Sequence, residues 1–160
     1  MWTCDTVVKA TGGTAHGAAA WEASGVSIDS RSVKPGELFV ALKGDRFDGH
    51  DYVKDALGRG AAGALVSAEV EGLPEDAPLV WVEDTHKALN DLAVHARRRT
   101  QAKVIAITGS VGKTGTKEAL AQALQPAGKV YASYGNYNNH IGLPLSMANL
   151  PEDAAYGVFE

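Results

Sequence analysis

The sequence has few cysteines, few aromatic residues and no long apolar segment. Its 160 residues include one cysteine, Cys4, which excludes an intramolecular disulfide and a cysteine-based zinc site. No apolar run approaches the ~20 residues that a membrane-spanning helix needs. The first residues also lack the basic and then apolar order of a signal peptide. We therefore expect a soluble, cytoplasmic protein without a membrane span.

An excess of basic charge is also missing. Residues 1–83 carry 7 basic and 13 acidic groups, and residues 84–160 carry 8 and 6. Neither half is basic enough to capture nucleic acid electrostatically. The run Arg97-Arg98-Arg99 is short and is typical of a solvated helix end. We expect no nucleic-acid partner.

The composition that remains is that of a folded α/β protein. Hydrophobic residues make up 45% of the chain, and the 18 glycines exceed what ordinary turns require. Short apolar runs at residues 26–28, 38–42, 64–66 and 79–82 predict strands, and the run 38–42 favours burial on both faces. Residues 5–10 predict a helix that ends at Gly12, and residues 52–57 predict a second helix with Asp51 as its N-cap.

The pattern changes after Glu83. An apolar stripe from Ala88 to Ala96 predicts a helix with Thr85 as its cap, and the β-branched run at residues 104–107 predicts a central parallel strand. A glycine-rich turn, a helix over 117–124 and a strand from Val130 complete a βαβ unit. We predict two domains, 1–83 and 84–160. Because residues 157–160 resemble a further strand, we expect the second domain to be truncated.

The segment Thr108-Gly109-Ser110-Val111-Gly112-Lys113-Thr114 lies directly after the predicted strand and opens a helix. Small residues let backbone N–H groups converge on phosphate oxygens, and the helix N-terminus favours negative charge. In such a loop the lysine reaches the β- and γ-phosphates, and the hydroxyl binds Mg²⁺. The usual first glycine is replaced by Ile107. The alternative is a chance match in a glycine-rich turn.

Two further groups of residues are less specific. Residues 135–145 contain Asn136, Asn138 and Asn139, which suit a polar ligand but equally suit an asparagine-rich turn. Residues 29–31 and the loop 44–50 each follow a predicted strand. They are turns when taken separately, but together they can line one pocket at the carboxyl ends of strands.

Taken together and in this order, the motifs resemble the ATP-dependent Mur ligases, which form the amide bonds of the peptidoglycan peptide. The short loop from Thr108 to Thr114 is the form that this family uses. Residues 29–31, 35–42 and 48–49 are similar to its uridine-nucleotide domain, and residues 136–145 are similar to the member that adds D-alanyl-D-alanine. The implied fold is a small α/β UDP-binding domain followed by the start of a P-loop ATP-binding domain.

The resemblance implies a role for each group of residues. ATP would bind at Gly109, Ser110, Val111, Gly112, Lys113 and Thr114, with Lys113 as the catalytic residue. Mg²⁺ would bind at Thr114 and Glu160. The UDP part of the substrate would bind at Ser30, Arg31, Asp45, Arg46, Phe47, Asp48 and Gly49, and its muramoyl-peptide part would face Asn138 and Asn139.

The implied reaction joins UDP-N-acetylmuramoyl-tripeptide to D-alanyl-D-alanine through an acyl phosphate. The resemblance also implies a longer parent enzyme that is monomeric, of which these 160 residues are an inactive piece. Three alternatives stay open at this point. They are the sibling ligase that adds the third amino acid, a folate-polyglutamate-type ligase, and a non-catalytic UDP-sugar-binding module.

Overall fold

The computed structural model describes residues 1–135 and 137–160, so Asn136 of the asparagine-rich motif lies outside the described residues. The chain forms two compact units, Met1–Leu92 and Ala93–Glu160. Helix α3 (Thr85–Arg99) contains the boundary between them. The units are described separately below.

Unit 1 is built on a five-stranded sheet with the order β2-β7-β6-β5-β4. The strands are β4 (Gly25–Ser27), β5 (Glu37–Val40), β6 (Gly63–Val66), β7 (Leu79–Trp81) and β2 (Thr14–His16). All neighbouring pairs are parallel except β2 with β7. The four parallel strands lie at the apolar runs of the sequence, so the strand predictions for those runs are confirmed. Strand β2 is fully exposed and polar at both ends, so no alternating pattern indicated it.

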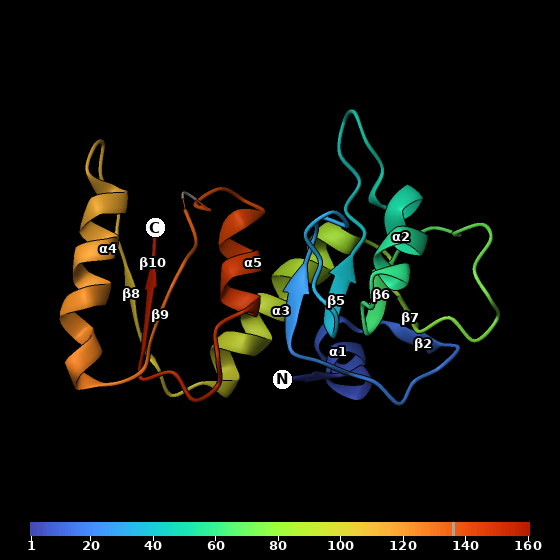
Figure 1. The fold of residues 1–160 in the computed structure, drawn as a ribbon, viewed down its shortest axis with the longest axis horizontal. Coiled ribbons are helices and arrows are strands. Elements are labelled where there is room, and N and C mark those ends of the chain that lie inside the picture. The colour runs from blue at the N-terminus through green and yellow to red at the C-terminus, as the bar shows by residue number, and fades with distance from the viewer. Residues whose placement is uncertain (136) are drawn as a thin grey trace. The chain divides into compact units, whose positions relative to one another are not determined.

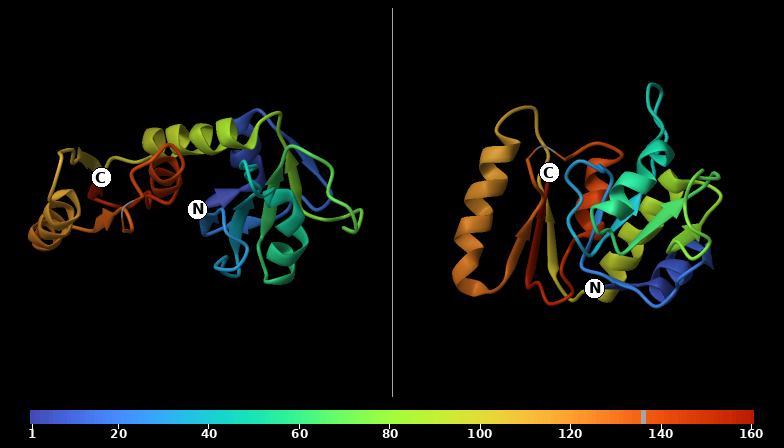
Figure 2. Two further views of the ribbon diagram at one scale, coloured as in Figure 1. Left: turned by 90° about the horizontal axis from the view of Figure 1, so that it is seen from above. Right: turned by 45° about the vertical axis from the view of Figure 1, so that its right-hand side comes forward.

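Both faces of this sheet are covered, as the continuous apolar run in β5 predicted. Phe39 and Ala41 pack with Val53 and Ala56 in one apolar cluster. Leu38 and Val40 point to the opposite face, because side chains alternate along a strand, and both are completely buried. Figure 2 shows helices on either side of the sheet.

In unit 1, helix α1 and the 3₁₀ turn before α2 begin where polar side chains accept backbone N–H groups. Helix α1 (Cys4–Thr11) has a capping box between Thr3 and Thr6, and it ends at Gly12 in the left-handed conformation, as predicted. The prediction of Asp51 as a cap is wrong. Asp48 caps a 3₁₀ turn, η1 (Gly49–Tyr52), and α2 (Val53–Gly58) follows it. A short two-stranded pair, β1 (Trp2–Thr3) with β3 (Glu22–Ala23), completes the unit.

Unit 2 is built on a parallel sheet with the order β8-β10-β9. Its strands are β8 (Lys103–Ala106), β9 (Val130–Ala132) and β10 (Tyr156–Phe159). The predicted βαβ pattern is present, but β10 lies between the two strands that the helix connects. Glu160 therefore directly follows the central strand. Helices α4 (Lys113–Leu124) and α5 (Gly142–Ala148) lie on opposite faces of this sheet (Figures 1 and 2).

From α3 onward, two helix starts and one whole helix differ from the sequence pattern. Asp84, not Thr85, caps α3, since its Oδ1 accepts the N–H groups of His86 and Lys87. Helix α4 begins four residues before the predicted start and is followed by a 3₁₀ turn, η2 (Gln125–Ala127). Helix α5 was not predicted because it contains Pro144, which is tolerated there because the first turn needs no N–H donor. No helix among the described residues is long and apolar enough to cross a membrane.

Candidate functional site

The glycine-rich loop of unit 2 connects the carboxyl end of β8 to the first residue of α4 (Figure 1). Residues 108–112 are all exposed. Gly112 immediately precedes the helix and has φ 79°, a left-handed conformation that a side chain disfavours. A Cβ at Gly112 would meet no atom within 4 Å, so the backbone conformation rather than space requires glycine here. The loop is thus open to solvent at a helix N-terminus, where an anion is favoured.

Lys113 lies across this loop. Its Nζ donates a hydrogen bond of 2.8 Å to the carbonyl oxygen of Gly109, four residues earlier. The ammonium group is therefore held over the loop backbone that the sequence assigns to phosphate. A phosphate bound there would interact with the positive charge of Lys113 and accept hydrogen bonds from the backbone N–H groups of the loop.

The residue after it, Thr114, contacts the end of the central strand. Its Oγ1 donates to Oε2 of Glu160 at 2.8 Å, and Nδ2 of Asn138 donates to Oε1 of the same carboxylate at 3.0 Å. These groups meet because β8 and β10 are parallel neighbours, so their carboxyl ends share one edge of the sheet. The N–H of Ile107 also donates to the carbonyl of Phe159 and extends this pairing to the loop.

The Thr114 hydroxyl and the Glu160 carboxylate are oxygen donors of the kind that Mg²⁺ prefers. Because Thr114 gives its proton to Glu160, its oxygen lone pairs remain for a cation. Within residues 1–135 and 137–160, no group of three or more His, Cys, Asp or Glu could hold a metal ion. One carboxylate and one hydroxyl fit a magnesium ion that also takes phosphate oxygens and water, which is its usual arrangement with nucleotides.

Sequence analysis gave no site role to Lys117, which lies one turn after Lys113 in α4. Its side chain is 2% exposed, and its Nζ donates to the carbonyl of Gly135 and lies 3.9 Å from Oε2 of Glu160. Only its polar type in a helix could have indicated a role, because helix lysines are almost always exposed. The structure therefore adds Lys117 and Gly135 to the surroundings of Glu160.

Asn139 contacts a different group from its neighbour Asn138. Its Oδ1 accepts the N–H groups of Ile141 at 3.1 Å and Gly142 at 2.7 Å, at the start of α5. Asn139 thus stabilises the turn that leads into α5, in agreement with the alternative of an asparagine-rich turn. Asn138, by contrast, is directed to Glu160.

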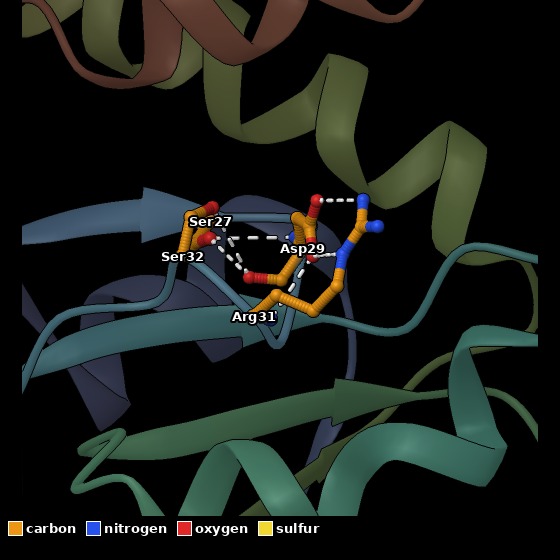
Figure 3. Close-up of polar contacts among 4 residues, drawn as sticks. All are labelled: Ser27, Asp29, Arg31 and Ser32. Atoms are coloured by element: carbon orange, nitrogen blue, oxygen red, sulfur yellow. Dashed lines mark hydrogen bonds and ion pairs between the residues drawn. The ribbon is translucent and has the colours of Figure 1, made fainter.

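In unit 1, the turn after β4 positions Arg31. The guanidinium is held by Asp29, with Nε–Oδ1 at 2.9 Å and Nη2–Oδ2 at 2.6 Å, and the side chain is 85% exposed (Figure 3). The hydrogen bonds from Arg31 lower the pKa of the Asp29 carboxyl below its usual value. Ser30 between them is buried. The arginine is therefore presented to solvent in a fixed orientation.

The loop after β5 is a tight turn. The N–H of Gly44 donates to the carbonyl of Phe47, and Lys43 forms a β-bridge with Asp48. Asp45, Arg46 and Phe47 are exposed at its tip. Gly49 is buried against the chain, where a Cβ would lie 2.7 Å from the backbone nitrogen and oxygen of Leu42. Since β4 and β5 are parallel neighbours, this loop and the Arg31 turn emerge at the same sheet edge.

His50, the last residue of the loop 44–50, has no role of its own in the sequence pattern, but it fixes the base of that loop. Its Nδ1 is hydrogen-bonded to Oδ1 of Asp48, and its Nε2 accepts the N–H of Ser67, just after β6, at 2.9 Å. An Nε2 that accepts a hydrogen bond carries no proton, so Nδ1–H is the donor to Asp48. The backbone N–H of His50 also lowers the pKa of Asp48. The histidine thus joins the loop after β5 to the strand end of β6.

Two family models match most of the chain. Residues 22–97 match the Mur ligase family, catalytic domain, and residues 107–160 match the Mur ligase middle domain. The chain belongs to the Mur ligase family.

Two curated relatives of the chain carry the same name. The chain is 47% identical over 135 residues to the UDP-N-acetylmuramoyl-tripeptide–D-alanyl-D-alanine ligase of Rickettsia prowazekii, and 42% identical over 135 residues to that of Escherichia coli. Each match covers 84% of this chain, and 30% and 29% of the respective relatives. The chain thus spans about 30% of the length of these curated relatives.

Solved structures agree with this result. A crystal structure of MurF from Acinetobacter baumannii superposes with a TM-score of 0.84 at 34% identity and covers 99% of this chain and 35% of that one. MurF from Thermotoga maritima in complex with ADP gives a TM-score of 0.68 at 34% identity, covering 85% of this chain and 31% of that one.

Proposed function

We propose that these residues are the N-terminal part of an ATP-dependent ligase that adds D-alanyl-D-alanine to UDP-N-acetylmuramoyl-tripeptide. The observation that carries the proposal is the convergence of the glycine-rich loop, Lys113, Thr114 and Glu160 at one sheet edge. The named relatives supply the reaction and its substrates. Since the proposed reaction consumes ATP and a UDP-linked precursor, we infer that the ligase works in the cytoplasm.

We propose that unit 1 holds the uridine nucleotide. Arg31, fixed by Asp29, supplies a charged fork for a diphosphate, and the exposed tip of residues 45–47 lies at the same sheet edge. Asp48 and Gly49 shape the base of that loop rather than its tip. Residues 1–83 of the sequence contain all of these groups.

In the proposed reaction, the terminal carboxylate of the tripeptide attacks the γ-phosphorus of ATP. The bond to ADP breaks and an acyl phosphate forms. The amine of D-alanyl-D-alanine then attacks the acyl carbon, loses a proton and displaces phosphate. Lys113 and the loop N–H groups orient and stabilise the transferring oxygens, which is the main protein contribution to phosphoryl transfer. Thr114 and Glu160 would hold Mg²⁺, which would supply positive charge against the phosphates.

The proposal is tested in the longer protein that carries these residues. We expect ADP release to require both UDP-N-acetylmuramoyl-tripeptide and D-alanyl-D-alanine. Lys113→Ala should lower turnover by about 10²–10³-fold, because one preorganised contact to the reacting group is lost. Lys129→Ala, which removes an exposed lysine paired with Asp153, is the control and should retain turnover.

Two results would contradict the proposal. Product formed with a diamino acid in place of D-alanyl-D-alanine would assign the chain to the sibling ligase. Binding of UDP with no response to ATP in any assay would make it a UDP-sugar-binding module, since the loop of unit 2 would then have no ligand.

A further inference from the structure

Lys117 is the buried charge that the proposed reaction does not use. The Lys117 side chain is 2% exposed and that of Glu160 is 3% exposed. Burying a lysine beside a carboxylate seldom adds stability over an apolar pair, because desolvation offsets the attraction. Yet α4 keeps a lysine on its inner face, one turn after the residue that lies across the phosphate loop. The burial of Lys117 beside Glu160 therefore needs an explanation other than stability.

Those contacts join three segments of unit 2. The side chain extends from α4, donates to the carbonyl of Gly135 in the segment after β9, and faces Glu160 at the end of β10. Gly135 precedes Asn138 by three residues, and Asn138 donates to the other oxygen of the same carboxylate. Lys117 thus contacts Glu160 directly and supports the segment that carries its second partner.

We propose that Lys117 is a positioning residue for the cation site. Its ammonium group holds the Gly135 carbonyl and the Glu160 carboxylate, so that Oε2 faces Thr114 and Oε1 faces Asn138 before a cation arrives. This inference rests on the proposed function, because it assumes that Thr114 and Glu160 bind the cation that accompanies ATP. Residues that orient metal ligands in this way typically change metal affinity by about 10–100-fold when they are removed.

The test measures metal binding rather than ligation. Mn²⁺ serves as the probe, and electron paramagnetic resonance follows its binding to the 160-residue chain, with ATP kept below the concentration of the chain so that free ATP does not take up the ion. We expect Lys117→Met, which keeps the length of the side chain but not its charge, to weaken Mn²⁺ binding by about tenfold or more. ATP affinity without divalent cation should change less than about twofold, since the loop N–H groups and Lys113 remain. If Lys117 had only a structural role, Lys117→Met would weaken both Mn²⁺ binding and ATP binding.

Two comparisons make the result specific. Lys129→Met makes the same chemical change in an exposed pair with Asp153 and should leave Mn²⁺ binding unaltered. In a Glu160→Gln background, Lys117→Met should cause no further loss, because the group it positions is gone. The variant that combines Glu160→Gln with Lys117→Met has neither buried charge. Its Mn²⁺ binding can therefore be measured even if Lys117→Met alone fails to fold.

The remaining outcomes overturn the inference in separable ways. Wild-type affinity or tighter Mn²⁺ binding in Lys117→Met would show that the ammonium does not position the ligands. A further loss in the Glu160→Gln background would show that it acts elsewhere. If the wild-type chain itself took up no Mn²⁺ with ATP, the cation site of the proposed function would fail together with this inference.

Discussion

At the scale of single residues, the acidic groups Asp29 in unit 1 and Glu160 in unit 2 are already held by partners. Asp29 takes two hydrogen bonds from the guanidinium of Arg31, and Glu160 is contacted by Thr114 and Asn138. Side chains fixed in this way lose less conformational freedom when a ligand binds. The effects of substituting them should therefore appear in ligand affinity.

Arg31→Ala should weaken UDP binding by about tenfold or more. The physical reason is the loss of a charge-assisted hydrogen bond to phosphate, worth about 1.5–3 kcal/mol. Isothermal titration of the 160-residue chain with UDP measures it. The matched control is Arg59→Ala, which removes a similarly aspartate-paired arginine that directly follows α2. Equal UDP affinities of wild type and Arg31→Ala would remove Arg31 from the site.

The stability of unit 2 should depend on pH at alkaline values because of one tyrosine. Burial raises the pKa of Tyr131 to about 12, while an unfolded tyrosine titrates near 10. Below pH 10 the phenol is neutral in both states and stability is unaffected. As the pH rises from 10 to 12, the unfolded state ionises first, and up to about 3 kcal/mol of stability is lost. Thermal unfolding across this range measures the loss.

Tyr131→Phe should flatten that alkaline fall, although it also removes the hydrogen bond to Ser146 and lowers stability at neutral pH. The slope against pH, rather than the absolute stability, is the quantity to compare. Tyr134→Phe, at an 81% exposed position, should keep the wild-type slope. An unchanged slope in Tyr131→Phe would show that another group causes the alkaline loss.

At the scale of elements, the start of α4 decides how the phosphate loop is shaped. Two glycines near this point have opposite requirements. Gly112 is left-handed just before the helix, whereas Gly115 lies inside its first turn. A Cβ would meet no atom within 4 Å at either position. The backbone conformation alone therefore distinguishes them.

Gly112→Ala should destabilise the chain by about 1–2 kcal/mol, the cost of placing an L-residue in the left-handed region. Gly115→Ala should stabilise it by about 0.5–1 kcal/mol, because alanine favours the helix. Chemical denaturation without nucleotide measures both changes. Equal effects of the two substitutions would mean that the loop relaxes out of the left-handed conformation at little cost.

At the scale of the whole molecule, each compact unit carries one candidate nucleotide site. The residues proposed to bind the uridine nucleotide lie in Met1–Leu92, and the glycine-rich loop with Glu160 lies in Ala93–Glu160. Because the chain spans about 30% of its relatives' length, we expect it to bind substrate without forming an amide.

Hydrogen exchange tests this division. UDP should protect peptides that contain residues 25–50 and leave residues 104–117 unaffected, because the two sites belong to separate cores. Assays for amide product with all substrates should remain blank. Protection of the glycine-rich loop by UDP, or product formed by the 160-residue chain, would contradict this division of function.

The sequence predicted the elements with a strong local signal. The apolar runs at β5, β6 and β8 and the stripe along α3 were recognised because burial on one or both faces leaves a periodic trace. Caps were predicted less well, since Asp48 and Asp84 were each overlooked in favour of a polar neighbour in sequence. Local pattern shows that a polar residue is available but not which one reaches the free N–H groups.

What the sequence determined by itself was the glycine-rich loop and the helix that follows it, because glycines, a lysine and a hydroxyl at fixed spacing act within one turn of chain. Only the tertiary structure decided what surrounds that loop. The insertion of β10 between β8 and β9 brings Glu160 to Thr114, 46 residues away in sequence. It also turns Lys117 from an ordinary helix lysine into a buried contact of Glu160. Strand order depends on which apolar faces are buried together, and no local pattern encodes that choice.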